Sequence, residues 1–368
     1  MSAHLLHIFS TFVAGGPQVR TAQLIGALGA DFRHSIVAMD GREDARSLLP
    51  PEVDCHVLPA PERGGSLRTV RRIRRLLGEV QPDLVLTYNW GAIEALMAAR
   101  LGGRHGTLHH EDGFRPDELG GFKKRRIWAR RLVLRGRDVI VPSNTLFRIA
   151  TELWQLDAQR VHWIPNSIRV ENFQPADGNA SRRERLGIPR DAIVIGSVGH
   201  LRGEKNPVRL IEAVADVECA RALHVLMLGD GAERENVEAA VERLGLRSRV
   251  HLVGHRENPA EDYRTMDLFA LSSDTEQMPI ALLEAMASGL AVVSTDVGDV
   301  REILPAEQRE FCCQLDAPSL ARAISRLLES DHKKLGRANR ARAAERFSFE
   351  GMVAAYRERL EAELAARA

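Results

Sequence analysis

The sequence lacks the features that mark several large classes of protein. No apolar run approaches the roughly 18 residues that a membrane-spanning helix needs, and the N-terminus has no signal-peptide pattern. The four cysteines form no C-x-x-C pair, and the adjacent Cys312 and Cys313 would bridge only with strain. Aromatic residues make up 5% of the chain, and no nucleic-acid-binding module is recognisable. We therefore expect a protein of the reducing cytoplasm, with no zinc site and no nucleic-acid partner.

The glycine fingerprint of dinucleotide-binding enzymes, G-x-G-x-x-G, is also absent. Gly15 and Gly16 follow the first predicted strand without the rest of the pattern, and Gly229-Asp230-Gly231 has Arg234 where the third glycine belongs. A nicotinamide-dependent enzyme is therefore disfavoured. Because paired glycines let a backbone approach a ligand closely, Gly15 and Gly16 remain candidate ligand contacts, whereas a tight turn is the simpler explanation of the second pair.

What the chain does contain is a nearly continuous alternation of short apolar runs and helical patterns. This alternation predicts parallel sheets covered by helices on both faces. A polar stretch at 166–190 interrupts it and has the composition of a linker. A chain of 368 residues, 44% of them hydrophobic, suits two domains of roughly 170 residues. We expect an α/β protein of two Rossmann-like domains, 1–172 and 173–347, whose strand-end loops face a central cleft.

The charges are distributed unevenly between these two domains. Residues 1–172 hold 24 Lys or Arg against 18 Asp or Glu, whereas the remainder holds 27 against 32. The excess lies mostly in two runs, 63–75 with six arginines and 123–137 with eight Lys or Arg. Solvated helix faces would explain both runs. The alternative is a surface that binds anionic lipid head groups, worth on the order of 1 kcal/mol per basic residue, at the inner face of the membrane.

A helix predicted within 271–295 carries an unusual carboxylate. Glu284 is the only charged side chain in I-A-L-L-E-A-M-A, where burial without partners costs roughly 2 kcal/mol or more. It either reaches solvent or accepts hydrogen bonds from ligand hydroxyls, and Glu276 precedes it by eight residues. Pro279 suits the first helical position. The N-terminus of this helix is a candidate anion site, with the residues Met278, Pro279 and Ile280.

A second candidate loop follows the first strand of the second domain. It has the sequence G-H-L-R-G-E-K-N and places two cations, Arg202 and Lys205, at a strand end. Arg can bind a phosphate bidentately and Lys acts as a point charge. Together with a helix N-terminus and a facing glycine loop, these cations could hold a pyrophosphate, while the two carboxylates hold hydroxyls. A ligand with both kinds of group is a nucleotide sugar.

Polar residues also gather at strand ends in the first domain. The strand over 106–108 leads into His109, His110 and Glu111, and a cluster of this kind at a strand end favours a functional role. Another predicted strand ends at Asn89 and Trp90, which are looser candidates for an acceptor-binding wall. His110 and Glu111 are candidates for the same wall.

Five segments carry a family resemblance: I-P-N-S-I (164–168), V-G-H-L-R-G-E-K-N (198–206), L-G-D-G (228–231), V-G-H (253–255) and E-Q-M-P-I-A-L-L-E-A-M-A-S-G-L-A-V-V (276–293). With them the chain resembles the family 4 glycosyltransferases, retaining enzymes with the GT-B fold of two facing Rossmann-like domains. The resemblance covers nearly the whole chain and is strongest from 193 to 305. Glu276 and Glu284 match the two ends of the family's E-x7-E signature.

The resemblance implies a role for each matched residue. Glu284 would bind the ribose hydroxyls of the nucleotide, and Glu276 would contact the transferred sugar. Lys205 would neutralise the diphosphate as the glycosidic bond breaks. Gly16 would close over the phosphates, and the base would lie against the loop of Gly254, His255 and Arg256. A C-terminal helix over 348–368 would cross back onto the first domain.

The chain departs from the family pattern in two places. The family usually has Arg where this chain has His200, so either His200 or Arg202 takes the phosphate role. Gln277 replaces a glycine that often lies near the sugar. The family also carries a catalytic His near the transferred sugar, and His109 matches it by strand position, with His110 as the alternative.

The implied reaction is transfer with retention of configuration, from a UDP- or GDP-sugar to a hydroxyl of a glycan, a lipid-linked saccharide or a lipid, as in cell-surface polysaccharide or glycolipid synthesis. Cations and helix N–H groups would stabilise the departing diphosphate without a metal ion or a cofactor, and no D-x-D cluster stands in a suitable context. A sugar-nucleotide epimerase and a non-catalytic nucleotide-sugar-binding protein are the alternatives.

Overall fold

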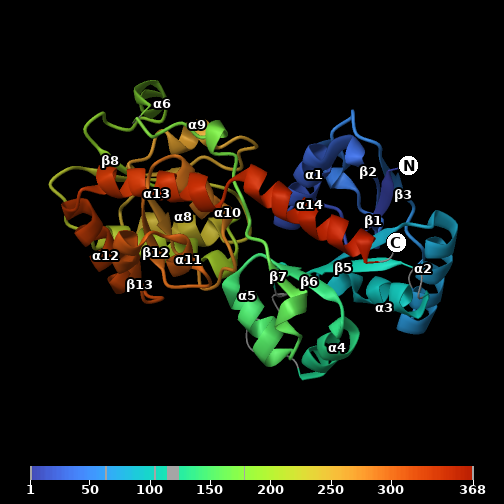
Figure 1. Cartoon of the computed structure of the whole chain (residues 1–368). Coiled ribbons are helices and arrows are strands. Elements are labelled where there is room, and N and C mark those ends of the chain that lie inside the picture. Colours follow the sequence, from blue (N-terminus) through green and yellow to red (C-terminus); the bar gives the residue numbers. More distant parts are fainter. Residues whose placement is uncertain (1, 63, 103–104, 114–123, 178, 367–368) are drawn as a thin grey trace. The chain divides into compact units, whose positions relative to one another are not determined.

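The computed structural model describes residues 2–62, 64–102, 105–113, 124–177 and 179–366 (Figure 1). The chain forms two compact units. The first consists of Met1–Asn166 together with Glu350–Ala368, and the second is Ser167–Phe349. The boundaries expected from the sequence, 172/173 and 347/348, lie six residues after the first observed boundary and two residues before the second.

The first unit contains a parallel sheet of seven strands in the order β3-β2-β1-β4-β5-β6-β7. The strands are β1 (Ala3–Phe9), β2 (Phe32–Ala38), β3 (Cys55–Leu58), β4 (Leu84–Tyr88), β5 (Gly106–His110), β6 (Asp138–Val141) and β7 (Val161–Trp163). The helices of this unit are α1 (Gly16–Leu28), α2 (Ser66–Val80), α3 (Ile93–Gly102), α4 (Lys124–Leu134), α5 (Asn144–Arg148) and α14 (Phe349–Ala365). The chain order reverses between β1 and β4, as in other doubly wound sheets.

The second unit contains a parallel sheet of six strands in the order β10-β9-β8-β11-β12-β13. The strands are β8 (Ile193–Val198), β9 (Leu223–Leu228), β10 (Val250–Leu252), β11 (Leu268–Leu271), β12 (Ala291–Thr295) and β13 (Cys312–Cys313). The helices are α6 (Ala180–Arg185), α7 (Pro207–Ala215), α8 (Arg234–Arg243), α9 (Ala260–Tyr263), α10 (Ile280–Ala287), α11 (Val300–Ile303), α12 (Ala317–Glu329) and α13 (His332–Arg346). Two Rossmann-like parallel-sheet domains were the expected architecture, and this expectation is confirmed.

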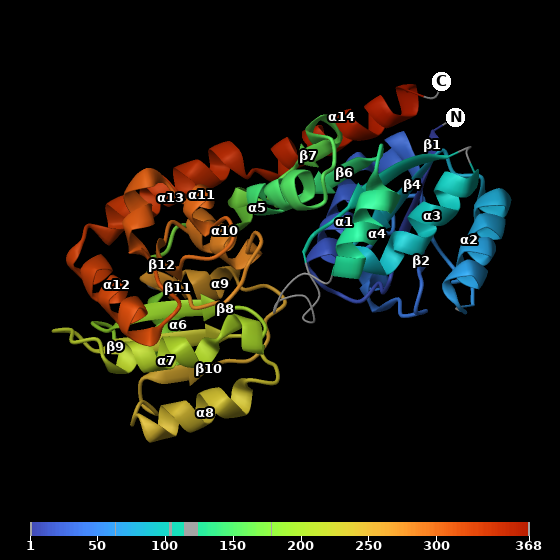
Figure 2. The same cartoon turned by 90° about the horizontal axis from the view of Figure 1, so that it is seen from below.

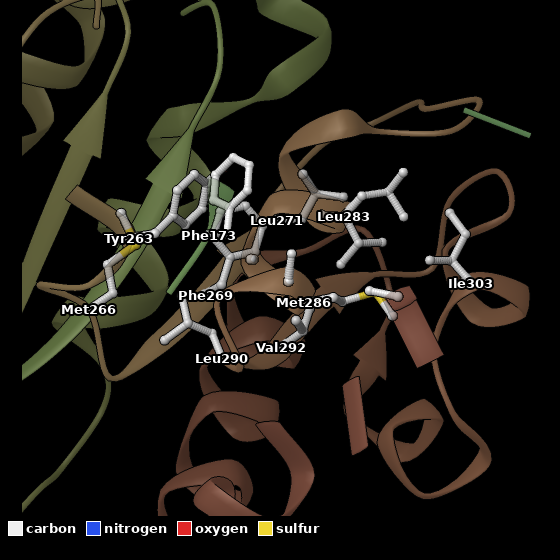
Figure 3. Packing of buried hydrophobic residues seen from close by; sticks show 14 of the residues in the cluster. Phe173, Tyr263, Met266, Phe269, Leu271, Leu283, Met286, Leu290, Val292 and Ile303 are labelled. Atoms are coloured by element: carbon white, nitrogen blue, oxygen red, sulfur yellow. The ribbon is translucent and has the colours of Figure 1, made fainter. Parts of the chain in front are cut away.

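Buried side chains on alternate strand positions form two cores in the second unit. One core lies between the sheet and α7, α8 and α12 (Figure 2). The other lies on the opposite face against α10 and α13. In this second core Tyr263 packs edge-on against Phe173 and beside Phe269, with ring centroids 5.8 and 6.0 Å apart (Figure 3). Almost all of α10 is therefore enclosed, which fixes the position of its single carboxylate.

The first unit also covers both faces of its sheet. On one face α2 and α3 pack on Leu6, Ile8 and Val85. On the other face lie α1 and α14, and α14 runs along the sheet in both views (Figures 1 and 2). The ring of Tyr356 in α14 stacks on His110 of β5, with centroids 5.6 Å apart, so the last helix of the chain belongs to this unit.

None of the helices in the described part of the chain is both long enough and apolar enough to span a membrane. All four cysteines are free thiols.

Candidate active site

In the second unit, the carboxyl ends of β8 and β11 bring together two residues that are distant in sequence. Nζ of Lys205 lies 2.6 Å from Oε1 of Glu276. Lys205 ends a short 3-10 turn after β8, and Glu276 follows β11. The hydroxyl of Ser272 donates to the carbonyl oxygens of Lys205 and Asn206 at 3.1 and 2.9 Å, which fastens the lysine loop to the end of β11.

A second serine orients the carboxylate itself. The hydroxyl of Ser273 donates to Oε1 of Glu276 at 2.7 Å, and the carbonyl of Ser273 accepts from Thr295 at 2.7 Å. Within the described part of the chain both side-chain contacts of the glutamate fall on Oε1, so Oε2 can accept a further hydrogen bond. Glu276 is 9% exposed. Sequence reasoning missed Ser273, although a serine three residues before a carboxylate is a local signal.

The backbone of Glu276 rests against a glycine. Gly298 has a φ of +53°, and a Cβ at this position would lie 2.1 Å from the carbonyl oxygen of Glu276. Only glycine combines this left-handed conformation with such a close approach. This contact could not be predicted from the sequence, because it depends on how the loop after β12 folds over the loop after β11.

Glu284 lies in α10, partly exposed, with a neighbour that the sequence did not reveal. The hydroxyl of Tyr263 donates to Oε2 of Glu284 at 2.7 Å. Burial raises the pKa of Glu284 to about 7, although the hydrogen bond from Tyr263 acts in the opposite direction. A carboxylate held in this way can accept hydrogen bonds from ligand hydroxyls when it is ionised.

The N-terminus of α10 differs in detail from the prediction. Pro279 has extended backbone angles and is the N-cap, and the helix begins at Ile280. Pro279 has no N–H group, so it contributes no donor to an anion site. The backbone N–H of Leu282 bonds to the carbonyl of Pro279 at 3.2 Å. The donors that this helix start can offer an anion are therefore those of Ile280 and Ala281. Met278 is buried beside this turn.

The loops after β8, β9 and β10 meet through backbone contacts. The N–H of Gly229 bonds to the carbonyl of Gly254 at 2.8 Å. A Cβ on Gly229, whose φ is +131°, would lie 1.8 Å from the carbonyl oxygen of Gly199. Gly229 is therefore needed for loop packing, in agreement with the tight-turn interpretation.

Four candidate side chains of these loops are exposed: His200, Arg202, His255 and Arg256. The rings of His200 and His255 stack, with centroids 6.3 Å apart and an interplanar angle of 4°. Arg202 lies 3.8 Å from Glu204 within the same loop. Both candidates for the phosphate role, His200 and Arg202, thus lie at the same strand end as Lys205.

In the first unit, the glycine pair opens α1 as expected. Gly15 is the N-cap, and its carbonyl accepts from Val19 at 2.9 Å. Gly16 is the first helical residue and Pro17 follows it.

Strand alternation separates the two adjacent histidines. In the sheet His109 pairs with Thr87 and His110 pairs with Tyr88, and neighbouring residues of a strand point to opposite faces. Nδ1 of His109 lies 2.8 Å from the hydroxyl of Thr87. The ring of His110 stacks on Tyr88, with centroids 4.5 Å apart. Both histidine side chains are fully buried.

His109 belongs to a buried polar network. Nε2 of His109 lies 3.5 Å from Oε2 of Glu111, and Arg130 of α4 donates to both carboxylate oxygens at 3.2 Å. Burial raises the pKa of Glu111, but His109 and Arg130 outweigh it and the net shift is downward. The guanidinium of Arg130 also lies over Trp90 and Trp154, at 5.1 and 4.9 Å from the ring centroids. The candidates Trp90 and Glu111 are thereby joined in one network.

Asn89 is held in a strained conformation. Its φ is +57°, a backbone angle that is unfavourable for residues other than glycine. Its N–H bonds to the carbonyl of His110 at 2.7 Å, and its Oδ1 accepts from the N–H of Asp112 at 2.7 Å. Asp112 in turn pairs with Arg20 of α1 at 2.6 Å. Sequence reasoning assigned no role to Arg20 or Asp112, which come together only in the folded unit.

Comparison with known proteins agrees with the geometry of both units. Residues 15–167 match the family model described as "Glycosyl transferase 4-like domain". Residues 179–346 match the model described as "Glycosyl transferases group 1". Together the two matches take in most of both units.

The chain is also similar to curated proteins. It is 26% identical over 276 residues to the UDP-Gal:alpha-D-GlcNAc-diphosphoundecaprenol alpha-1,3-galactosyltransferase of Escherichia coli, a match that covers 72% of this chain and 70% of the relative. It is 31% identical over 222 residues to the D-inositol 3-phosphate glycosyltransferase of Segniliparus rotundus, covering 56% of this chain and 49% of that relative. The chain thus spans about half the length of this second relative.

Solved structures share the fold over the full length of the chain. HepE of Anabaena in complex with UDP has a TM-score of 0.82 at 20% identity, with 98% of this chain and all of that chain covered. A glycosyltransferase of Rickettsia africae has a TM-score of 0.81 at 18% identity, with 98% of each chain covered. The two matched domains, the E-x7-E carboxylates and the shared GT-B fold lead to one conclusion: this chain belongs to the family 4 glycosyltransferases.

Proposed function

We propose that the protein is a retaining glycosyltransferase that moves a sugar from a nucleotide-diphosphate sugar to a hydroxyl of a glycan, a lipid-linked saccharide or a lipid. The observation that carries this proposal is the pairing of Lys205 with Glu276 at the carboxyl ends of β8 and β11. Ligands of doubly wound sheets bind at that end. A cation for the leaving diphosphate and a carboxylate for the sugar therefore stand where the bond to be broken would lie.

Binding of the diphosphate is assigned to positively charged groups. Lys205 and Arg202 supply full charges on one loop. The start of α10 supplies the N–H groups of Ile280 and Ala281 and the positive end of the helix dipole. Preorganised donors of this kind stabilise charge that develops on a leaving group. In this proposal the transfer requires neither a metal ion nor a cofactor.

The carboxylates of Glu276 and Glu284 bind different hydroxyl groups of the donor. Glu284 takes the ribose hydroxyls, and its contact with Tyr263 fixes one carboxylate oxygen. Glu276 takes a hydroxyl of the transferred sugar through Oε2, because Oε1 is occupied by Lys205 and Ser273. The two glutamates do not act as a glycosidase pair, since one of them serves the ribose.

The remaining donor contacts follow the family assignment. The loop of Gly254, His255 and Arg256 is proposed to lie against the base, and Gly15 and Gly16 against the phosphates. Met278 and Pro279 shape the turn at the start of α10.

The two histidines proposed as catalytic alternatives differ in the hydrogen-bond partners of their ring nitrogens. His109 has both ring nitrogens near polar partners, Thr87 and Glu111. His110 has no hydrogen-bond partner on either ring nitrogen among the described residues. His109 retains the assignment by strand position, and its network would hold the end of β5 in place. The proposed acceptor wall consists of Asn89, Trp90, His110 and Glu111.

The surface of the first unit supports a membrane-associated acceptor and a cytoplasmic, peripheral location. Five arginines of α2 are exposed: Arg68, Arg71, Arg72, Arg74 and Arg75. In the second basic run Arg130 is buried against Glu111, so that run is not a continuous surface. Arg63 and Lys123 lie outside the described residues. The E. coli relative is named for a substrate linked to diphosphoundecaprenol.

Exposed apolar side chains accompany the charges of α4. Trp128 is 67% exposed and Leu132 is 70% exposed, one turn apart on the same helix. Aromatic and aliphatic side chains beside basic residues are typical of interfacial helices. We propose that α2 and α4 contact an anionic lipid surface.

The proposed activity is tested by incubating the protein with a panel of UDP- and GDP-sugars, with and without lipid-linked and soluble saccharide acceptors. Transfer, or slow hydrolysis of one donor, supports the proposal, and NMR of the product establishes whether the anomeric configuration is retained. Epimerised nucleotide sugar would instead identify an epimerase. Binding without turnover of any donor would identify a non-catalytic protein.

A further inference from the structure

The first unit contains a buried ion pair that the proposed reaction does not yet use. Arg20, on α1, is 7% exposed and lies with its guanidinium 2.6 Å from Oδ1 of Asp112. The same guanidinium donates to Oδ1 of Asn166 at 2.9 Å. Burial lowers the pKa of Arg20, but Asp112 outweighs it and the net shift is upward. The guanidinium and its carboxylate partner have thus been taken out of water together as a close pair.

Charges are seldom buried for stability alone. Desolvation of a paired Arg and Asp costs several kcal/mol per ion, and apolar side chains of similar volume are often equally stable. Stability alone therefore does not explain why this ion pair is buried, whereas its position in the first unit does.

The pair joins segments that carry candidate site residues. Arg20 lies one turn after Gly16, in the helix that opens with the glycine pair. Asp112 directly follows Glu111, and its backbone N–H donates a hydrogen bond to Oδ1 of Asn89 at 2.7 Å. Alternation along β5 and beyond places Glu111 with His109 on one side of the sheet, against Arg130 of α4. It places Asp112 with His110 on the other side, against α1.

The Asp112 side is also where buried polar atoms are left without partners. Among the described residues, no hydrogen bond is made by either ring nitrogen of His110, by Nε of Arg20, by Oδ2 of Asp112 or by the hydroxyl of Tyr356. Buried polar atoms without partners are rare and costly in folded proteins. On the His109 side, by contrast, His109, Glu111 and Arg130 satisfy one another. Of these two sides, the Asp112 side therefore holds more of the unused hydrogen-bonding capacity among the described residues, next to Asn89 and His110.

We propose that Arg20 and Asp112 are positioning residues of the transfer reaction, whose buried ion pair fixes residues 111–113, directly after β5, and the strained Asn89 relative to the first turns of α1. This inference rests on the proposed function, because it assigns these segments to the site. Tyr356 of α14 closes the cluster by stacking on His110. The last helix of the chain thus completes the surroundings of a loop that lies more than 200 residues earlier in the sequence.

The test compares single and double variants of the pair in the full-length protein. Arg20→Met and Asp112→Leu each leave one buried charge unpaired, whereas the double variant removes both. We expect each single variant to lower kcat at least tenfold and to lower the Tm. We expect the double variant to recover most of the Tm but not kcat. Affinity for a nucleoside diphosphate, most of whose proposed contacts lie in the second unit, should fall much less than kcat in all three variants.

A purely structural pair would behave differently. In that case kcat would return together with the Tm in the double variant, which would overturn the proposal, as would single variants with kcat within twofold of wild type. Arg20→Lys keeps the charge without the planar fork and should recover part of kcat.

Hydrogen exchange separates this inference from the proposed function. In Arg20→Met the N–H groups of Asn89 and Asp112 should exchange at least tenfold faster than in wild type, while those of Val139–Val141 in β6 stay unchanged. Unchanged exchange at Asn89 and Asp112 would refute the positioning role even in an active enzyme. Faster exchange in a protein that turns over no donor would keep the positioning role and refute the glycosyltransferase assignment.

Discussion

Lys205 and Glu276 are separated by 71 residues in the chain, yet Nζ of the lysine lies 2.6 Å from Oε1 of the glutamate. Each residue neutralises the other when no donor is bound. In the proposed reaction, the ammonium group would also attract the diphosphate, while Oε2 of the glutamate accepts a sugar hydroxyl.

We predict that Lys205→Ala lowers kcat for the best donor by about 100-fold or more, because removing one preorganised charge-stabilising group has effects of that size. The exposed Lys333, at the start of α13, provides a matched control, and Lys333→Ala should retain full activity. Steady-state kinetics measure both variants. A Lys205→Ala enzyme with kcat within threefold of wild type would contradict the assignment of the diphosphate to this lysine.

Glu284→Ala should abolish most of the affinity for nucleoside diphosphates, since it removes an acceptor assigned to the ribose hydroxyls. Thermal stabilisation by UDP and GDP measures this loss, and Tyr263→Phe, which removes only the supporting hydroxyl, should have a smaller effect. If UDP or GDP stabilised Glu284→Ala as well as it stabilises wild type, the ribose assignment would be wrong.

The raised pKa of Glu284, about 7 against an ordinary value of 4.5, predicts a pH-dependent stability. At pH values between these two pKa values, Glu284 is protonated in the folded state and ionised in the unfolded state. The stabilisation is fully present below pH 4.5 and is lost as the pH rises through 7. Because a single proton is exchanged, the slope cannot exceed about 1.4 kcal/mol per pH unit.

Urea unfolding at several pH values between 4.5 and 8 measures this dependence. In Glu284→Gln the other titrating groups remain, so the difference from wild type isolates Glu284. Wild type should lose more of its free energy of unfolding than the variant does over this range. Parallel curves for the two proteins would contradict the raised pKa.

Gly298→Ala should lower activity through the backbone of Glu276, because its Cβ would lie 2.1 Å from that carbonyl oxygen. Gly245 is the matched control: its φ is +66° and a Cβ there meets nothing within 4 Å. Gly245→Ala should cost only the strain of the left-handed conformation, about 1–2 kcal/mol of stability, and leave kcat unchanged. Equal kinetics for the two variants would show that the contact with Glu276 does not matter.

Arg130→Met should destabilise the protein by about 3–5 kcal/mol, because it leaves the buried Glu111 without its cation. The exposed pair of Arg75 and Glu79 in α2, 2.9 Å apart, provides the comparison. Arg75→Met should cost less than about 1 kcal/mol. Urea unfolding at neutral pH measures the free energy of unfolding of both variants. An equally small loss for Arg130→Met would show that the network does not stabilise the first unit.

If α2 and α4 bind membranes, the protein should sediment with anionic vesicles at low ionic strength and be released as salt is added. Trp128→Ala should weaken binding severalfold at every salt concentration, because it removes apolar contact area. Leu315→Ala, which alters an exposed leucine of the second unit, should have no effect. Absence of sedimentation at low salt would refute the lipid surface.

The local pattern of the chain was enough to predict the class of fold and to propose one part of the candidate site. Alternating strand and helix periods require parallel sheets, and the E-x7-E spacing with Pro279 and Gly289 is contained in one loop and one helix. The approach of Glu276 to the cationic loop could be anticipated for a different reason, because both follow strands of one parallel sheet and ligands bind at the carboxyl ends of such strands.

Tertiary structure alone decided which atoms face one another. His109 and His110 are adjacent, yet the sheet turns one towards Arg130 and the other towards Tyr356, and only the packing of α4 and α14 determines what each ring meets. Tyr263, Ser273, Gly298 and the pair of Arg20 and Asp112 come from separate elements, so no spacing in the sequence could reveal their contacts. The sequence determined the kinds of groups available and the ends of the strands that carry them. Burial and the close approach of loops determined which groups are charged, held or left open to a ligand.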